Sequence, residues 1–181
     1  MKLEKQLLGL ILSKPNTKKI KIISEELEMK SKFNLNNDFE DVKGIWELRW
    51  SSSKAPFLNY FPLVDNLQIL DPIDGKAMNL LKPKGIKAII GTVILAKIEP
   101  INNIRIRVQF TKAGLIGPSI GFSRLKALVK IKKKQLGWLD ITYMSDQIRI
   151  CRGDKGTLFI LMKRKDEILF ERYKKFIDRF Y

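Results

Sequence analysis

The sequence predicts a mainly β fold: an antiparallel sheet closed into a barrel, with helices before it and one helix after it. Apolar and polar residues alternate with the period of two that strands require, over residues 43–110 and again over 139–162. Short connections rich in Gly, Pro, Asn and Asp separate these runs. We predict closure of the sheet because an all-β domain would otherwise leave its edges exposed.

The chain divides into a helical segment over residues 1–40, the barrel over residues 41–164 and an amphipathic helix over residues 165–181. In the first segment, apolar residues recur at helical spacing in two runs that Pro15 separates. Asn16 and Thr17 are suited to cap the second helix. The first run consists of Leu3, Leu7, Leu10 and Ile11, and the second of Ile20, Ile23 and Leu27.

The strand that opens the barrel follows Lys43, and its apolar side chains would share one face. A later strand over residues 102–111 has the clearest alternation in the chain. Further runs at 67–70, 77–81 and 87–98, together with a three-stranded meander over 138–163, give about eight strands.

The secondary structure of residues 111–137 is ambiguous, whereas that of the C-terminal segment is clear. Residues 111–137 fit two structures, because Leu125, Leu128 and Val129 suit a short helix, whereas residues 128–132 would equally extend a strand. From residue 166 onward, one apolar stripe predicts an amphipathic helix. This stripe consists of Leu169, Tyr173, Phe176 and Phe180.

Composition excludes several classes of protein. With 181 residues and 45% apolar content, the chain can bury one sizeable core. Its single cysteine, Cys151, allows no internal disulfide and is expected to be a small buried residue. The longest apolar run, Leu7–Leu12, is too short for a transmembrane helix or a signal peptide.

The absence of histidine excludes histidine-based acid–base catalysis and histidine metal sites. The aspartates of the C-terminal half show no metal-ligand spacing, and we expect Asp140 to form an ion pair with a partner such as Arg149. We therefore predict no enzymatic activity, no metal and no cofactor.

The net charge of +16 predicts attraction to polyanions, although heavy use of Lys, Ile and Asn is also typical of a genome rich in A and T. A basic cluster could bind the headgroups of an anionic membrane, bind a phosphodiester backbone or form a solvated loop. Few aromatic residues accompany this cluster, which makes nucleic acid the less favoured partner. The cluster consists of Lys126, Lys130, Lys132, Lys133 and Lys134.

Gly44 and Trp46 form a Gly-x-Trp pattern at the start of the first strand, which resembles the start of a lipocalin barrel. That resemblance implies that Trp46 closes one barrel end beneath an arginine from a late strand. Either Arg149 or Arg152 could cover the indole by cation–π contact. Asp154 would accept backbone hydrogen bonds in the last hairpin turn or act at the barrel mouth.

The runs Gly44–Trp50 and Trp138–Lys163 closely resemble the plastid lipid-associated proteins, also called fibrillins, and the cyanobacterial type in particular. The most characteristic stretch is Ile148–Gly156, where Cys151 replaces a residue that is usually small. The resemblance implies a lipocalin-like barrel that binds small lipophilic molecules, such as carotenoids, quinones or lipids. It also implies a place on the cytoplasmic side, peripheral to a thylakoid membrane.

A barrel of about eight strands has room for one slender ligand. We expect the apolar residues of inward parity to line it, with one aromatic residue near the mouth. These candidate ligand-binding residues are Leu48, Trp50, Ile106, Val108, Phe110, Tyr143 and, at the mouth, Phe122. Side chains of this size could instead fill the barrel, which would make the protein a peripheral membrane or assembly protein without a pocket.

Overall fold

The computed structural model describes residues 2–13, 15–55, 58–86, 90–120, 123–132 and 136–181, with backbone alone at 119–120 and 123–124. Within these residues nine strands form one sheet, and every strand pairing is antiparallel. The predicted fold, mainly β with a barrel-like antiparallel sheet, N-terminal helices and a C-terminal helix, is confirmed. The strands are β1 (Gly44–Ser51), β2 (Val64–Asp71), β3 (Lys76–Pro83), β4 (Gly91–Pro100), β5 (Arg105–Ile120), β6 (Ser123–Lys130), β7 (Leu136–Met144), β8 (Ile148–Gly153) and β9 (Leu158–Arg164).

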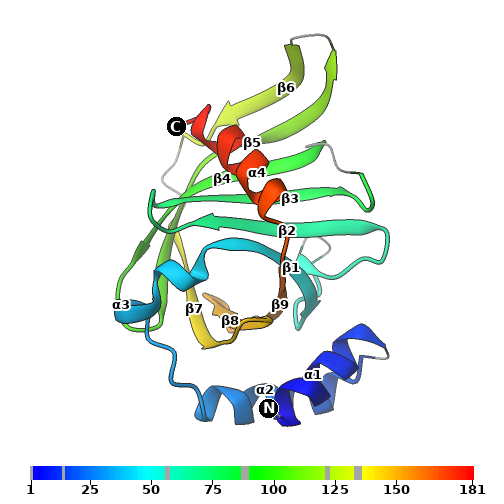
Figure 1. Cartoon of the computed structure of the whole chain (residues 1–181), viewed down its shortest axis with the longest axis vertical. Helices are drawn as coiled ribbons and strands as arrows, with labels where there is room; N and C mark the ends of the chain where they lie inside the picture. Colours follow the sequence, from blue (N-terminus) through cyan, green and yellow to red (C-terminus); the bar gives the residue numbers. More distant parts are fainter. Residues whose placement is uncertain (1, 14, 56–57, 87–89, 121–122, 133–135) are drawn as a thin grey trace.

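The sheet closes into a ring. Its strand order is β4-β3-β2-β1-β9-β8-β7-β5-β6, and an additional pairing joins β4 to β5 (Figure 1). β5 makes closure possible because it is long. Its first part pairs with β7, its later part pairs with β6, and its other edge pairs with β4.

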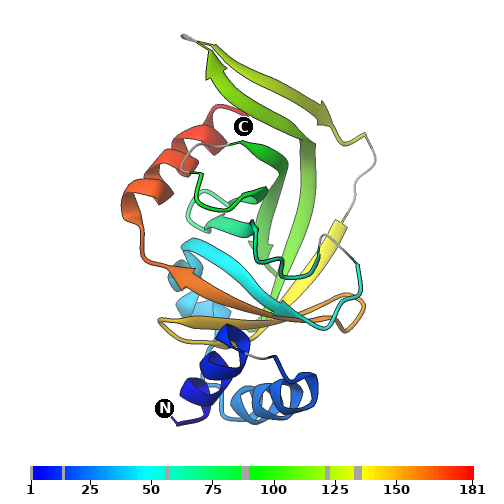
Figure 2. The same ribbon diagram turned by 90° about the vertical axis from the view of Figure 1, so that its right-hand side faces the viewer.

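The segment that fitted both a helix and a strand is a strand pair. The later part of β5 and all of β6 form a hairpin that projects beyond the ring (Figure 2). Gly114 permits the close approach of the two strands, because a Cβ there would lie 1.9 Å from the carbonyl oxygen of Ala127. This hairpin, which we call the β5–β6 hairpin, accounts for the strand beyond the expected eight.

Helices cover the outside of the ring on two sides. The helices are α1 (Lys2–Leu12), α2 (Thr17–Met29), α3 (Leu35–Asp38), the 3-10 helix η1 (Glu40–Val42) and α4 (Glu167–Asp178). α1 and α2 pack against β1 and the meander, whereas α4 crosses the outer face of β1, β2 and β3 (Figure 1). The division into segments 1–40, 41–164 and 165–181 stays a prediction, because packing contacts do not measure independent folding.

Local signals explain where these helices begin. The side chain of Asn16 accepts a hydrogen bond from the backbone N–H of Lys19 at 3.0 Å, which caps α2 as predicted. The side chain of Asp166 caps α4 in the same way, through the N–H of Leu169 at 2.9 Å. Both caps satisfy N–H groups that lack partners within the helix.

α3 and η1 close one end of the ring. Leu35 and Val42 are buried in the interior cluster together with Trp46. The backbone N–H of Leu35 donates to the carbonyl oxygen of Asn103 at 2.7 Å, which fixes α3 to the connection that precedes β5. The opposite end of the ring carries the connections between β1 and β2, between β3 and β4, and between β8 and β9.

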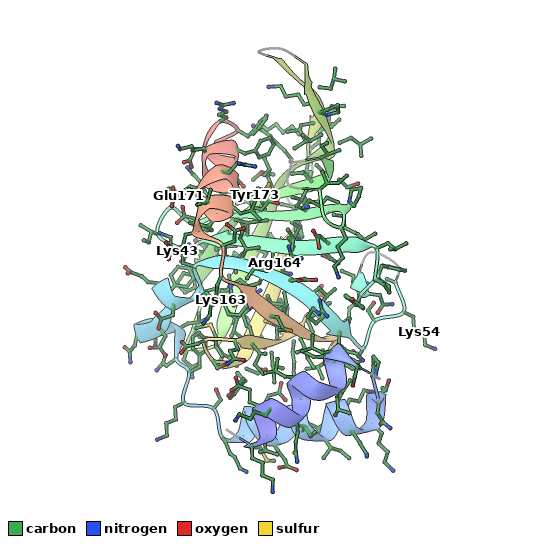
Figure 3. All side chains as sticks on the ribbon, turned by 45° about the vertical axis from the view of Figure 1, so that its right-hand side comes forward. Lys43, Lys54, Lys163, Arg164, Glu171 and Tyr173 are labelled. Atoms are coloured by element: carbon green, nitrogen blue, oxygen red, sulfur yellow. The ribbon has the colours of Figure 1, made fainter. Side chains whose placement is uncertain are left out.

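Charged residues hold the last strand beneath α4. Arg164, at the end of β9, pairs with Glu47 at 2.9 Å and with Asp65 at 2.6 Å. Asp65 also pairs with the buried Lys82 at 3.0 Å. Figure 3 shows Arg164 beside Tyr173, which comes from α4. The charges therefore compensate one another where the helix covers the sheet.

Candidate functional site

A cavity of about 420 Å³ lies inside the ring. Four of the predicted ligand-binding residues line it: Leu48 from β1, and Ile106, Val108 and Phe110 from β5. Further apolar lining comes from Leu70, Ile94, Ile98, Leu139 and Phe159. At the end opposite α3, Leu58, Asp154 and Lys155 stand at the cavity. Its volume lies in the range of small-molecule sites.

The structure adds a polar and small-residue part to the lining that sequence reasoning missed. Asn66 and Gln68 from β2 and Asn79 from β3 face the cavity, together with Ala77 and Ala96. They alternate with apolar residues that point outward beneath α4, namely Leu67, Ile69, Met78, Leu80, Val93 and Leu95. One sequence signal could have revealed this inner face. The apolar stripe of the C-terminal helix requires an apolar surface outside the ring, which leaves the alternating residues to face inward.

Arg149 lines the cavity near its closed end, and the buried Trp46 lies beneath its guanidinium. Trp46 is fully buried, and its Nε1 donates to the carbonyl oxygen of Val42 at 2.9 Å. The guanidinium of Arg149 lies 4.7 Å from the indole centroid, within cation–π range. Of the two arginines that the sequence offered, Arg149 therefore covers Trp46. Arg152 points outward and binds Glu28 of α2 through Nε at 2.9 Å and Nη2 at 2.6 Å.

Arg149 is fully buried and lines the cavity. Its Nη2 donates to Oε1 of Gln68 at 2.5 Å. Burial lowers the pKa of Arg149, and the neighbouring thiol of Cys151 opposes that shift. A guanidinium still keeps its proton at neutral pH. The cavity floor therefore carries a positive charge.

The inward orientation predicted for Trp50 and Tyr143 is wrong. The register of β1 against β9 shifts between Leu48 and Trp50, and that of β7 against β8 shifts between Ile141 and Tyr143. A bulge adds one residue and reverses the side-chain alternation beyond it. Both side chains accordingly lie outside the ring, packed against α1 and α2.

Tyr143 serves to attach a helix. Its hydroxyl donates to Oε2 of Glu4 at 2.8 Å, and the hydroxyl of Ser145 donates to Oε1 of the same carboxylate at 3.1 Å. Burial, followed by the contact with Glu4, raises the pKa of Tyr143 to about 12. The contact joins α1 to β7 and gives Tyr143 no access to the cavity.

Other predicted residues have different surroundings from those expected. Asp140 pairs with Arg105 at 2.7 Å rather than with Arg149, and the Arg105 guanidinium also lies 3.8 Å from the Trp138 ring centroid. Asp140 and Arg149 point to opposite faces of the ring, which explains the difference. Cys151 is buried as expected, and burial raises the pKa of its thiol to about 11. Phe122 lies outside the described residues.

The basic cluster belongs in part to the β5–β6 hairpin. Lys126 lies over the ring of Phe180 at 4.9 Å, and Lys130 and Lys132 are exposed. Lys133 and Lys134 lie outside the described residues. On the hairpin face turned away from α4, three apolar side chains are exposed: Leu115 by 62%, Leu125 by 56% and Val129 by 69%. We call these three residues the hairpin apolar face.

The part of the chain that the structure describes contains neither a candidate metal site nor a candidate membrane-spanning helix. No group of three or more Asp, Glu or Cys side chains lies close enough together to hold a metal ion. None of the described helices has the length and apolar character needed to cross a membrane.

Comparison with known proteins agrees with the resemblance noted in the sequence. The model of the PAP_fibrillin family matches residues 2–162. The probable plastid-lipid-associated protein 12, chloroplastic, of Arabidopsis thaliana is 27% identical over 140 residues, which are 70% of this chain and 34% of that protein. The chain thus spans about a third of the length of this curated relative. No solved structure matches the chain.

Proposed function

The chain belongs to the PAP_fibrillin family, and from that membership we propose that it binds one small lipophilic molecule inside the ring. The observation that carries the proposal is the cavity of about 420 Å³ with its largely apolar lining. Burial of apolar ligand surface there would contribute about 25 cal/mol per Å². The name of the Arabidopsis thaliana relative, a probable plastid-lipid-associated protein, supports a lipid, carotenoid or quinone as the ligand class.

The proposed role is binding without catalysis. The chain has no histidine, and the cavity lining consists of aliphatic, aromatic, amide and guanidinium groups with Asp154 and Lys155 at one end. Such a lining offers shape and hydrogen bonds. Arg149, which lies over Trp46, acts in this proposal as the closed floor, with Asp154 at the mouth and Arg152 holding α2.

A cavity-filling variant tests the proposal. Ala96 faces the cavity and is only 4% exposed, so Ala96→Phe places a ring in the space that a ligand needs. We expect binding of an apolar fluorescent probe to weaken at least about tenfold, which corresponds to about 1.4 kcal/mol. Ala127→Phe is the matched control, because Ala127 is exposed on the β5–β6 hairpin.

Two results would contradict the proposal. The first is equal probe binding by Ala96→Phe and the parent, with both proteins folded. The second is a solvent extract of protein from its native host that contains no apolar molecule at near-stoichiometric amount by mass spectrometry.

We further propose that the β5–β6 hairpin rests on an anionic membrane surface, which would make the protein peripheral to a photosynthetic membrane. Apolar side chains flanked by lysines suit a lipid interface, where each lysine contributes about 1 kcal/mol. The hairpin offers the hairpin apolar face on one side, and the exposed Lys130 and Lys132 lie close to it, with Lys130 on the opposite face of β6. A cyanobacterial origin and the cytoplasmic side of the membrane stay predictions.

Flotation with anionic liposomes tests this second proposal. Changing Leu115, Leu125 and Val129 together to Gln should abolish most of the binding. A control variant with Met29, Leu63 and Ile168 changed to Gln removes three apolar side chains elsewhere that are even more exposed, and it should bind as the parent does. If double-stranded DNA of equal charge strips the protein from the liposomes, the hairpin is a nucleic-acid patch and the membrane proposal fails.

A further inference from the structure

Arg149 has no carboxylate partner among the described residues, in contrast to several other arginines. Arg105, Arg152 and Arg164 each pair with a carboxylate at 2.9 Å or less. Arg149 is fully buried, yet its Nη2 donates to the neutral amide of Gln68. Its Nε and Nη1 have no hydrogen-bond partner among the described residues. The neighbouring thiol of Cys151 is at most a weak acceptor, so these donors of a buried cation lack a strong acceptor.

This arrangement costs free energy unless another group compensates the charge. A buried ion without a counter-ion, and a buried donor without an acceptor, are both unfavourable. The face of Trp46 compensates part of the charge, but the ammonium of Lys163 lies 5.2 Å from the same indole centroid. Two cations thus share one ring, so the floor of the cavity stays electropositive.

The rest of the cavity sets the shape of a matching partner. Arg149 lies with Trp46 and Gln68 toward the closed end, whereas the apolar lining continues along β5 through Ile106, Val108 and Phe110. An occupant that satisfies both parts has an acceptor at one end and a slender apolar body. A carboxylate fits, because it supplies the missing negative charge and accepts a charge-assisted hydrogen bond from a guanidinium N–H group.

We propose that the cavity takes a long-chain carboxylate head first, with the carboxylate accepting a hydrogen bond from the Arg149 guanidinium and the acyl chain along the apolar lining. The proposal rests on the proposed binding function and names its ligand class. It also assigns Arg149 a role beyond covering Trp46, namely that of a ligand-binding residue.

The first test compares dodecanoate with its methyl ester, as competitors that displace an apolar fluorescent probe from the full chain. The two ligands share one acyl chain and differ in head charge. We expect the parent to bind the acid about 10- to 100-fold more tightly than the ester, as hydrogen bonds to a charged group predict.

The variant Arg149→Met should bring the acid-to-ester affinity ratio close to one. Arg152→Met is the matched control, since Arg152 lies on the same strand but points outward to Glu28. We expect this control to keep the ratio of the parent. Near-UV circular dichroism of the tryptophans shows whether each variant folds.

Gln68→Glu tests the same contact without removing Arg149. The substitution preserves the side-chain shape and places a carboxylate where Oε1 accepts from Nη2 at 2.5 Å. This internal counter-ion should raise the melting temperature, because it compensates the buried charge, and should abolish the preference for the acid. The variant keeps the proposal testable if Arg149→Met does not fold.

The outcomes separate the two proposals. Equal binding of acid and ester by the parent, or an unchanged ratio in both variants, overturns the head-first carboxylate and leaves the lipophile-binding function in place. Failure of the parent to bind the probe and either competitor overturns the binding function itself.

Discussion

Two walls of the ring use the same strand alternation in opposite ways. In the wall formed by β2, β3 and β4, buried apolar side chains point outward beneath α4, and the inner face mixes amides and alanines with aliphatic residues. In the wall formed by β7, β8 and β9, each face carries a buried apolar cluster. Ile141, Cys151 and Leu161 pack inside, and Ile148, Ile150 and Ile160 pack outside beneath α1 and α2.

This difference shows that, in the β2–β4 wall, the side chains that stabilise the fold and the side chains that line the cavity lie on opposite faces. The β2–β4 wall is stabilised from outside, where α4 completes an apolar cluster. Its inner face is thereby free to carry small and polar residues, which leave room for the cavity. The β7–β9 wall packs on both sides and supplies the rigid floor that holds Arg149 over Trp46.

The largest expected effect is on the free energy of unfolding, and it distinguishes the two faces of β3. Leu80 is fully buried beneath α4, whereas the adjacent Leu81 is half-buried at the cavity. Leu80→Ala should lower the free energy of unfolding by about 2–5 kcal/mol, as for other buried leucines, and Leu81→Ala by less than about 1.5 kcal/mol. Urea denaturation measures both.

The β7–β9 wall provides the contrast. Ile160 and Leu161 are neighbours on β9, point to opposite faces and are both fully buried. Each change to Ala should cost about 2–5 kcal/mol, because either face loses packed atoms. If Leu81→Ala lowers the free energy of unfolding as much as Leu80→Ala does, the inner face of β3 is packed core. The proposed difference between the two walls would then be wrong.

A smaller effect compares one buried tyrosine at each helical cover. The Tyr143 hydroxyl donates to Glu4 at 2.8 Å, whereas the Tyr173 hydroxyl has no hydrogen-bond partner within the described residues. Tyr143→Phe should destabilise by about 1–3 kcal/mol because Glu4 loses a buried partner, and Tyr173→Phe should be neutral or slightly stabilising. Thermal unfolding of the two variants provides the measurement, and equal losses would contradict the assignment.

The smallest effect is the dependence of stability on alkaline pH. Burial first, and then Glu4, raise the pKa of Tyr143 to about 12, above the ordinary value of 10.0. A raised pKa means that the folded state holds this proton more tightly, so its contribution to stability is full below pH 10 and falls toward pH 12. Tyr143→Phe should therefore lose less stability than the parent over that interval in urea titrations. A steeper loss of stability in Tyr143→Phe than in the parent would contradict the raised pKa of Tyr143.

Sequence reasoning predicted the fold because its signals are local. The alternation of β5 and of the meander, the Asn16 cap and the stripe of α4 each follow from neighbouring residues. The position of Trp46 under a late arginine came from a family resemblance. These features required no knowledge of how distant elements pack.

The predicted site was only partly right because alternation does not define which face is inside. Trp50 and Tyr143 changed faces at single-residue bulges, which no residue type near them indicates. On β2 and β3, apolar residues point to α4, so strand alternation alone gave no sign that Gln68 and Asn79 face the cavity. Only the packing of a helix far away in sequence resolves that choice.

The pairing of β1 with β9 also determines when the ring can form during synthesis. Every other pairing in the ring joins strands that are consecutive or next but one along the chain, whereas Ile45 must meet Arg164. At about 5–20 residues per second, a nascent β1 would wait on the order of ten seconds for its partner. During that interval its edge is an open template for other strands. Ring closure is therefore the pairing that leaves a strand edge of this protein exposed for longest during synthesis.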